Sequence, residues 1–184
     1  MPTVVVPFRG ENAKRRLEPV PAEARNTLAE AMLDDVLDAC DAVGHEVRVA
    51  RAGPQGEAVE AALRSVENGP VLVVNADLPC AKPRDLLTLL GALPEGGIAL
   101  VEAEDGTTNA LALAAPHLFA PLYGPGSAER FRGRAERLGV PSATTRIPNL
   151  ADDVDTLGDL ERLDGRLGPH TSAVFEELRA GLTL

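Results

Sequence analysis

The chain has 184 residues, of which 45% are apolar, and a formal charge of −10 at pH 7. This length suits one domain over residues 1–184, and the apolar share is enough for a sizeable core. The negative charge opposes attachment to nucleic acids and anionic membranes, and an aromatic content of 3% removes the stacking platforms of single-strand binders. We therefore expect no nucleic acid and no membrane among the partners.

The cysteines and the N-terminal segment favour a cytoplasmic protein. Cys40 and Cys80 have no metal-like spacing and fit a reducing compartment better than a disulfide scaffold. No apolar run approaches membrane-spanning length, and the first residues lack the pattern of a signal peptide. We expect a cytoplasmic location.

Strands and helices are expected to alternate along the first hundred residues. The first strand covers residues 3–7 and ends at a proline, and a long helix with apolar residues along one face follows from Pro21 to Val43. Further strands are expected at 46–51, 71–74 and 98–101, and further helices at 58–66 and from Pro83 to Leu90. This alternation predicts an α/β protein with a mostly parallel central sheet flanked by helices.

The second half is expected to continue with shorter elements. A polar loop at 104–109 leads into a strand at 110–113, and a Gly-rich turn at 124–127 leads into a helix. A late strand over 140–147 and an acidic loop over 149–155 precede C-terminal helices that extend to Leu182. Together with the helix from Pro21 to Val43, these last helices could form a homodimer interface.

The buried strand at 71–74 ends in a polar turn that presents Asp77. Pro79 cannot donate a ladder hydrogen bond, so the strand must end before it. Ligands of open α/β sheets bind beyond the carboxyl ends of the strands, where a carboxylate can hold Mg²⁺ against nucleotide phosphates. The alternative is an ordinary turn or capping aspartate.

Two charged loops are further candidates. The basic loop from Arg9 to Arg16 follows the first strand and could hold a triphosphate, although it matches neither a P-loop nor a GxGxxG motif. In an extended chain Asp153 and Asp155 point to one side, where they could meet Asp77 across a divalent cation. The alternatives are a solvated basic cluster and a helix start, with Thr156 in a capping box.

Two polar turns complete the candidates. The turn from Gly124 to Ser127 precedes a helix, whose N-terminal N–H groups and serine hydroxyl could bind a phosphate or carboxylate. The turn at 106–109 enters an apolar strand and carries Thr108. An ordinary capped turn and a hairpin-like loop explain the same residues.

Taken in order, six segments resemble the CofC/FbiD family of guanylyltransferases, which act in coenzyme F420 biosynthesis. The matching segments are Val5-Val6-Pro7-Phe8 with Asn12-Ala13-Lys14-Arg15-Arg16-Leu17, Ala31-Met32-Leu33-Asp34-Asp35-Val36-Leu37, Asn75-Ala76-Asp77-Leu78-Pro79, Thr108-Asn109-Ala110-Leu111, Tyr123-Gly124-Pro125-Gly126-Ser127, and Asp153-Val154-Asp155-Thr156 with Asp159-Leu160. The resemblance spans nearly the whole chain.

The resemblance implies a single-domain nucleotidyltransferase fold of the GT-A/Rossmann-like type. It also implies that GTP condenses with phosphoenolpyruvate or 2-phospho-L-lactate, that pyrophosphate leaves, and that the next enzyme of the pathway consumes the product. 3-Phosphoglycerate is a further acceptor in this family. The alternatives are a guanylyltransferase for molybdopterin or a sugar phosphate, and a non-catalytic nucleotide-binding domain.

The resemblance also assigns roles to individual residues. Lys14 and Arg16 resemble the triphosphate-binding pair and act in catalysis together with Asp77. The expected Mg²⁺ ligands are Asp77, Asp153 and Asp155. The expected contacts to the phosphate and carboxylate of the acceptor are Thr108, Gly124 and Ser127. Arg15, Ala128 and Tyr123 depart from the usual residues of the family, which leaves the identity of the acceptor open.

Overall fold

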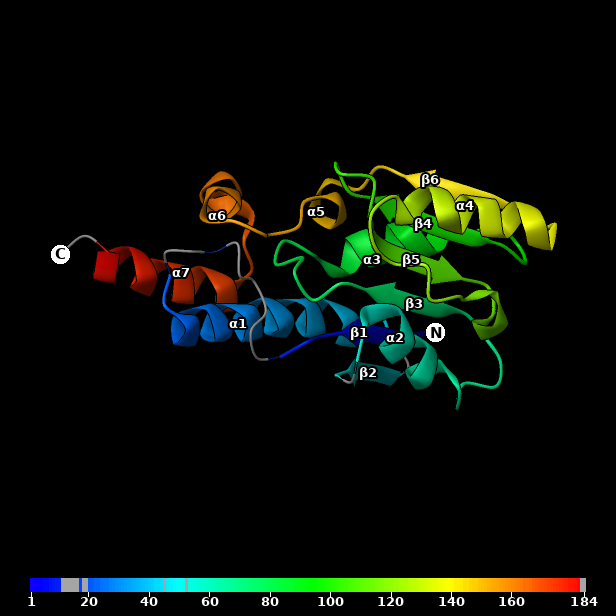
Figure 1. Ribbon diagram of the computed structural model, residues 1–184, viewed down its shortest axis with the longest axis horizontal. Coiled ribbons are helices and arrows are strands. Elements are labelled where there is room, and N and C mark those ends of the chain that lie inside the picture. The colour runs from blue at the N-terminus through cyan, green and yellow to red at the C-terminus, as the bar shows by residue number, and fades with distance from the viewer. Residues whose placement is uncertain (11–16, 18–19, 45, 52, 183–184) are drawn as a thin grey trace.

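A six-stranded sheet forms the centre of the protein in the computed structural model, which describes residues 1–10, 17, 20–44, 46–51 and 53–182 (Figure 1). The strand order is β2-β1-β3-β5-β4-β6. The strands are β1 (Thr3–Pro7), β2 (Glu46–Ala50), β3 (Val71–Val74), β4 (Ile98–Glu102), β5 (Thr108–Leu113) and β6 (Ser142–Thr145). Neighbouring strands are parallel except that β5 is antiparallel to both β3 and β4. The expected mostly parallel α/β sheet is confirmed.

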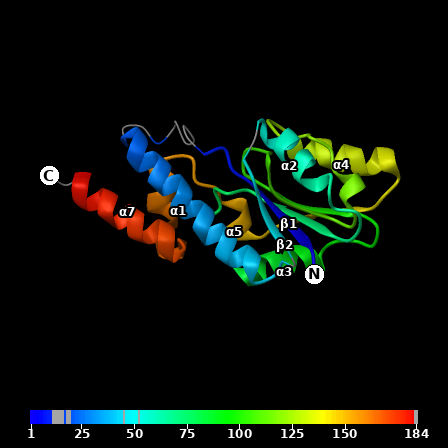
Figure 2. The ribbon, with the colours of Figure 1, turned by 90° about the horizontal axis from the view of Figure 1, so that it is seen from below.

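Helices cover both faces of this sheet. They are α1 (Ala22–Asp41), α2 (Gln55–Leu63), α3 (Pro83–Gly91), α4 (Ser127–Leu138), α5 (Pro148–Ala151), α6 (Leu157–Leu163) and α7 (Pro169–Leu182), with short 3₁₀ turns at Pro116–Leu118 and Asp164–Arg166. Successive residues of a strand face opposite sides, so Val4 and Val6 pack with α1 and α3, whereas Val5 packs with α2 and α4. Figure 2 shows these two helical layers on either side of the sheet.

Helices α1 and α7 lie side by side and extend beyond the sheet (Figures 1 and 2). The buried face of α1 packs within the chain, where its apolar residues share one core with the strands, α6 and α7. The homodimer expected for this helix therefore stays a prediction. Among the described helices, none combines the length and apolarity that a membrane span requires.

Several element boundaries differ from those expected. Helix α2 begins at Gln55, directly after Pro54, and ends at Leu63 instead of residue 66. The segment at 149–155 is only partly a loop, because Pro148 starts the short helix α5, and its preset φ suits the first position of a helix. The aspartate loop proper is therefore residues 152–155. The late strand is also shorter than expected and covers only Ser142–Thr145.

The reversed direction of β5 brings its first residues to the edge where β3 and β4 end. Ala110 is paired with Val74, and Thr108 with Glu102. The backbone N–H of Asn75 donates to the carbonyl oxygen of Asn109 at 3.0 Å. The polar segments before β5 and after β3 therefore meet at one edge of the sheet.

Candidate active site

Asp77 lies just beyond the carboxyl end of β3, as expected. The strand is entirely buried, and Asp77 itself is half-buried, with its Oδ1 atom shielded from solvent. Its backbone carbonyl accepts a hydrogen bond from the N–H of Val154 at 3.0 Å. This bond fixes the aspartate loop against the end of the strand.

The aspartate loop turns two of its carboxylates toward Asp77. The side chain of Val154 is fully buried in the core, so the residues on either side of it face the opposite way. Asp77, Asp153 and Asp155 each offer a carboxylate oxygen, and these oxygens lie within 4.8 Å of one another. The structure thus brings together the three carboxylates that the sequence spacing predicted.

The third acidic residue of the loop, Asp152, has a different environment. Arg162 donates to its Oδ1 at 3.1 Å, and Arg166 forms a short ion pair with its Oδ2. Burial alone would raise the pKa of Asp152, but the hydrogen bonds from Arg166 and Arg162 outweigh it and hold the pKa below its ordinary value. Asp152 is therefore neutralised by Arg162 and Arg166.

The electrostatics of the carboxylate cluster suit a divalent cation. Burial raises the pKa of Asp153, the charge of Asp77 raises it further, and a hydrogen bond from Asn109 opposes the shift. Close like charges repel one another, and a bound cation would remove that repulsion. Because hard cations such as Mg²⁺ prefer carboxylate oxygens, this donor set fits Mg²⁺.

Thr108 and Ser127, two of the predicted acceptor-binding residues, are buried and bonded to each other. The Ser127 hydroxyl accepts from the Thr108 N–H at 2.9 Å and donates to the Thr108 hydroxyl at 3.2 Å. Gly124, the third, has φ of +113°, a conformation that favours glycine. In this structure the two hydroxyls join α4 to β5, and their contact with an acceptor stays a prediction.

Arg130, which the sequence did not single out, shapes the turn before α4. Its guanidinium donates to the carbonyl oxygens of Leu122, Tyr123 and Pro125. An arginine one turn into the helix after a Gly-rich segment is the only sequence signal for this role. Hydrogen bonds from Arg130 to three backbone carbonyl oxygens thus hold the turn that carries Gly124.

A chain of amides, also missed from the sequence, runs along the same edge. The Gln55 side chain, at the start of α2, donates to the Asn75 side chain at 2.7 Å, and Asn75 donates to the Thr108 carbonyl at 3.2 Å. The only sequence signal for this role of Asn75 is its position two residues before Asp77.

The predicted triphosphate-binding residues Lys14 and Arg16 lie outside the described residues, so their role stays a prediction.

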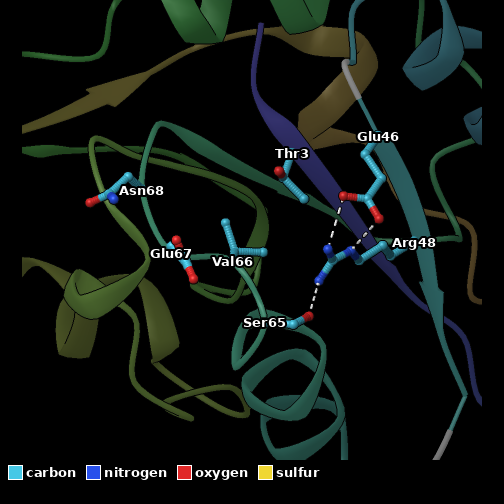
Figure 3. A pocket seen from close by; sticks show the side chains of 7 residues that line it. All are labelled: Thr3, Glu46, Arg48, Ser65, Val66, Glu67 and Asn68. Atoms are coloured by element: carbon cyan, nitrogen blue, oxygen red, sulfur yellow. Dashed lines mark hydrogen bonds and ion pairs between the residues drawn. The ribbon is translucent and has the colours of Figure 1, made fainter.

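A hollow of about 350 Å³ lies elsewhere, at the amino ends of β1 and β2 (Figure 3). Its lining residues are Thr3, Glu46, Arg48, Ser65, Val66, Glu67 and Asn68. Arg48 is already engaged there, because its guanidinium contacts the carboxylate of Glu46 and the hydroxyl of Ser65 (Figure 3). Ligands of open α/β sheets bind at the opposite ends of the strands, so this hollow is not the candidate active site.

The fold is shared by solved structures that are named as nucleotide-handling transferases. A solved structure from Desulfovibrio desulfuricans G20, which carries the name of a nucleotide-diphospho-sugar transferase, superposes with a TM-score of 0.70 at 16% identity. The match covers 97% of this chain and 95% of that one. Solved nucleotidyltransferases share the same fold.

Sequence comparison identifies the family. The chain is 34% identical to a phosphoenolpyruvate guanylyltransferase of Sphaerobacter thermophilus, covering 88% of this chain and 91% of the relative. It is also 34% identical to a 2-phospho-L-lactate guanylyltransferase of Haloferax volcanii, covering 85% and 82%. No family model matches the chain. The chain belongs to the phosphoenolpyruvate/2-phospho-L-lactate guanylyltransferase family, as the sequence motifs predicted.

Proposed function

We propose that this protein transfers GMP from GTP to the phosphate of phosphoenolpyruvate or 2-phospho-L-lactate and releases pyrophosphate. The observation that carries the proposal is the cluster of Asp77, Asp153 and Asp155 at the carboxyl edge of the sheet, with oxygens within 4.8 Å of one another. The names of the relatives supply the nucleotide and the acceptor class.

In this proposal the residues bind and orient two polyanions. An acceptor phosphate oxygen forms a bond to the α-phosphorus of GTP, and the bond from that phosphorus to the bridging oxygen of pyrophosphate breaks. Such transfers depend on positioning and charge neutralisation more than on covalent catalysis. Asp77, Asp153 and Asp155 would hold Mg²⁺, which when bound supplies positive charge beside the phosphates. Lys14 and Arg16 contribute further positive charge to the triphosphate.

The acceptor subsite is proposed at the turn between Gly124 and α4. N–H groups at a helix N-terminus favour an anion, and Thr108 and Ser127 add hydroxyls beside it. We further propose that the product, a guanosine diphospho-acid, passes to the next enzyme of coenzyme F420 biosynthesis in the cytoplasm. Phosphoenolpyruvate is the acceptor that we favour.

Pyrophosphate release tests the activity directly. Purified protein is incubated with GTP, Mg²⁺ and, in turn, phosphoenolpyruvate, 2-phospho-L-lactate and 3-phosphoglycerate, with ATP and acceptor-free reactions as controls. We expect Mg²⁺-dependent release with GTP and one of the first two acids. Binding of GTP that does not require Mg²⁺, without release for any acceptor, would instead indicate a non-catalytic nucleotide-binding domain.

Replacing Ser127 with alanine is expected to raise the KM for the acceptor more than that for GTP, because the hydroxyl lies in the acceptor subsite. The variant also loses two buried hydrogen bonds to Thr108, so we expect the free energy of unfolding to fall by about 1–2 kcal/mol. Steady-state kinetics with each substrate varied, together with urea unfolding, measure both effects. Equal increases in the two KM values would contradict a specific acceptor contact.

A further inference from the structure

Asn109, the second residue of β5, connects the sheet to the aspartate loop and to helix α5. Its side chain is almost completely buried, at 2% exposure. The Nδ2 atom donates to the carbonyl oxygen of Ala151 at 3.1 Å and to Oδ1 of Asp153 at 3.3 Å. The backbone of Asn109 is itself fixed by the N–H of Asn75. One rigid amide thus holds both the end of α5 and a carboxylate of the cluster.

The carboxylate of Asp153 needs such a restraint. The terminal torsion of an aspartate is broad, so its two oxygens interchange easily unless a donor holds one of them. Asp77 and Asp155 carry like charges beside it, which favours rotation of the carboxylate away from the cluster. Carboxylates that ligate metals are themselves usually held by hydrogen bonds from surrounding groups. Among the described residues, the side-chain donor that contacts Asp153 is Asn109.

We propose that Asn109 is a positioning residue: it holds one oxygen of Asp153, so that the other oxygen is presented with Asp77 and Asp155 to a divalent cation. The inference rests on the proposed function for the use of that cation in catalysis, but the holding of Asp153 can be measured without turnover. The strand direction supports the assignment, since only an antiparallel β5 brings its second residue beside the end of β3.

If Asn109 only anchored the chain segment, a different result would be expected. Asn149 provides the control that distinguishes the two roles. Asn149 lies in α5, donates to Asp85 at 2.9 Å and accepts from Arg166 at 3.1 Å. It therefore anchors the same segment of chain, but none of its hydrogen bonds reaches the three carboxylates. If anchoring alone mattered, loss of either asparagine would have the same effect on metal binding.

Titration of the full-length, metal-free protein with Mn²⁺, followed by electron paramagnetic resonance, tests the proposal. We expect Asn109→Ala to weaken Mn²⁺ binding by about 10–100-fold, the usual cost of losing a group that holds a metal ligand. Asn149→Ala is expected to leave the affinity unchanged. Asn109→Leu, which keeps the branched shape of the side chain but has no donor, serves if the alanine variant does not fold, as judged by circular dichroism.

Kinetics supply a second readout. The Mg²⁺ concentration for half-maximal pyrophosphate release should rise in Asn109→Ala, whereas kcat at saturating Mg²⁺ should recover toward that of the wild type. Unchanged Mn²⁺ affinity in the Asn109 variants, or equal weakening in Asn149→Ala, would overturn the proposal. A third outcome separates the two proposals. If Asn109→Ala weakens Mn²⁺ binding but the wild type releases no pyrophosphate with any acceptor, the proposed function is refuted and the role of Asn109 stands.

Discussion

Replacing Asp77 with asparagine is expected to lower pyrophosphate release on the order of a thousandfold, since a catalytic metal supplies several kcal/mol of transition-state stabilisation. Asparagine keeps the size of the side chain but removes the negative charge at the end of β3. The fold should survive, because Asp77 is only half-buried and the backbone bond from Val154 to residue 77 is retained. Pyrophosphate release with saturating GTP and acceptor measures the effect.

Asp152 offers a matched control for this variant. It belongs to the same acidic loop as Asp153, but Arg162 and Arg166 neutralise it. We expect Asp152→Asn to retain most of the activity and to lose at most about 1 kcal/mol of unfolding free energy, because these ion pairs are partly exposed. Near-normal release by Asp77→Asn, or an equal loss in both variants, would count against the carboxylate cluster as the active site.

The elements of the first half could be predicted because their sequence patterns are local. Strand β3 is buried on both faces and therefore consists of consecutive apolar residues, which is typical of a central strand in a sheet covered by helices on both sides. The direction of β5 could not be predicted, since it depends on pairing with strands remote in sequence. That direction is what brings Thr108 and Asn109 to the edge where Asp77 lies.

The candidate site, like the fold, could be predicted only where its geometry depends on residues close in sequence. Alternation around Val154 predicted that Asp153 and Asp155 share a side, because that depends on three adjacent residues. The separation of Asp152 from them depends on Arg162 and Arg166, which follow 10 and 14 residues later.

Contacts over longer sequence distances were not predictable. The hydrogen bond from Asn109 to Asp153 joins residues 44 positions apart. Ser127 was expected to offer its hydroxyl at a helix start, and its hydrogen bonds to Thr108, 19 residues earlier, were not foreseen. No local pattern encodes such pairs.

Loss of Asp35 is expected to destabilise the fold by about 2–4 kcal/mol, the cost of leaving buried donors of a helix start without their charged acceptor. Asp35 lies in α1 at 4% exposure, and its two oxygens accept from the backbone N–H groups of His170 and Thr171 at 3.0 and 2.9 Å. It therefore caps α7 from a neighbouring helix. Urea unfolding of Asp35→Ala measures the loss.

Gly168 allows this contact to be tested by a double-mutant cycle. A Cβ at Gly168 would lie 2.3 Å from Cγ of Asp35, so Gly168→Ala should also cost about 2–4 kcal/mol. In the Asp35→Ala background that clash is absent, and the second substitution should cost almost nothing. Asp38→Ala, which removes only an exposed contact with His170, should change the stability little. Additive costs of the two substitutions would show that the Asp35 carboxylate does not lie against Gly168 at the start of α7. The Gly168 N–H also donates to the carbonyl of Pro79 at 2.7 Å. A displaced start of α7 should therefore disturb the segment that carries Asp77, so we expect lower Mn²⁺ affinity in the same variants.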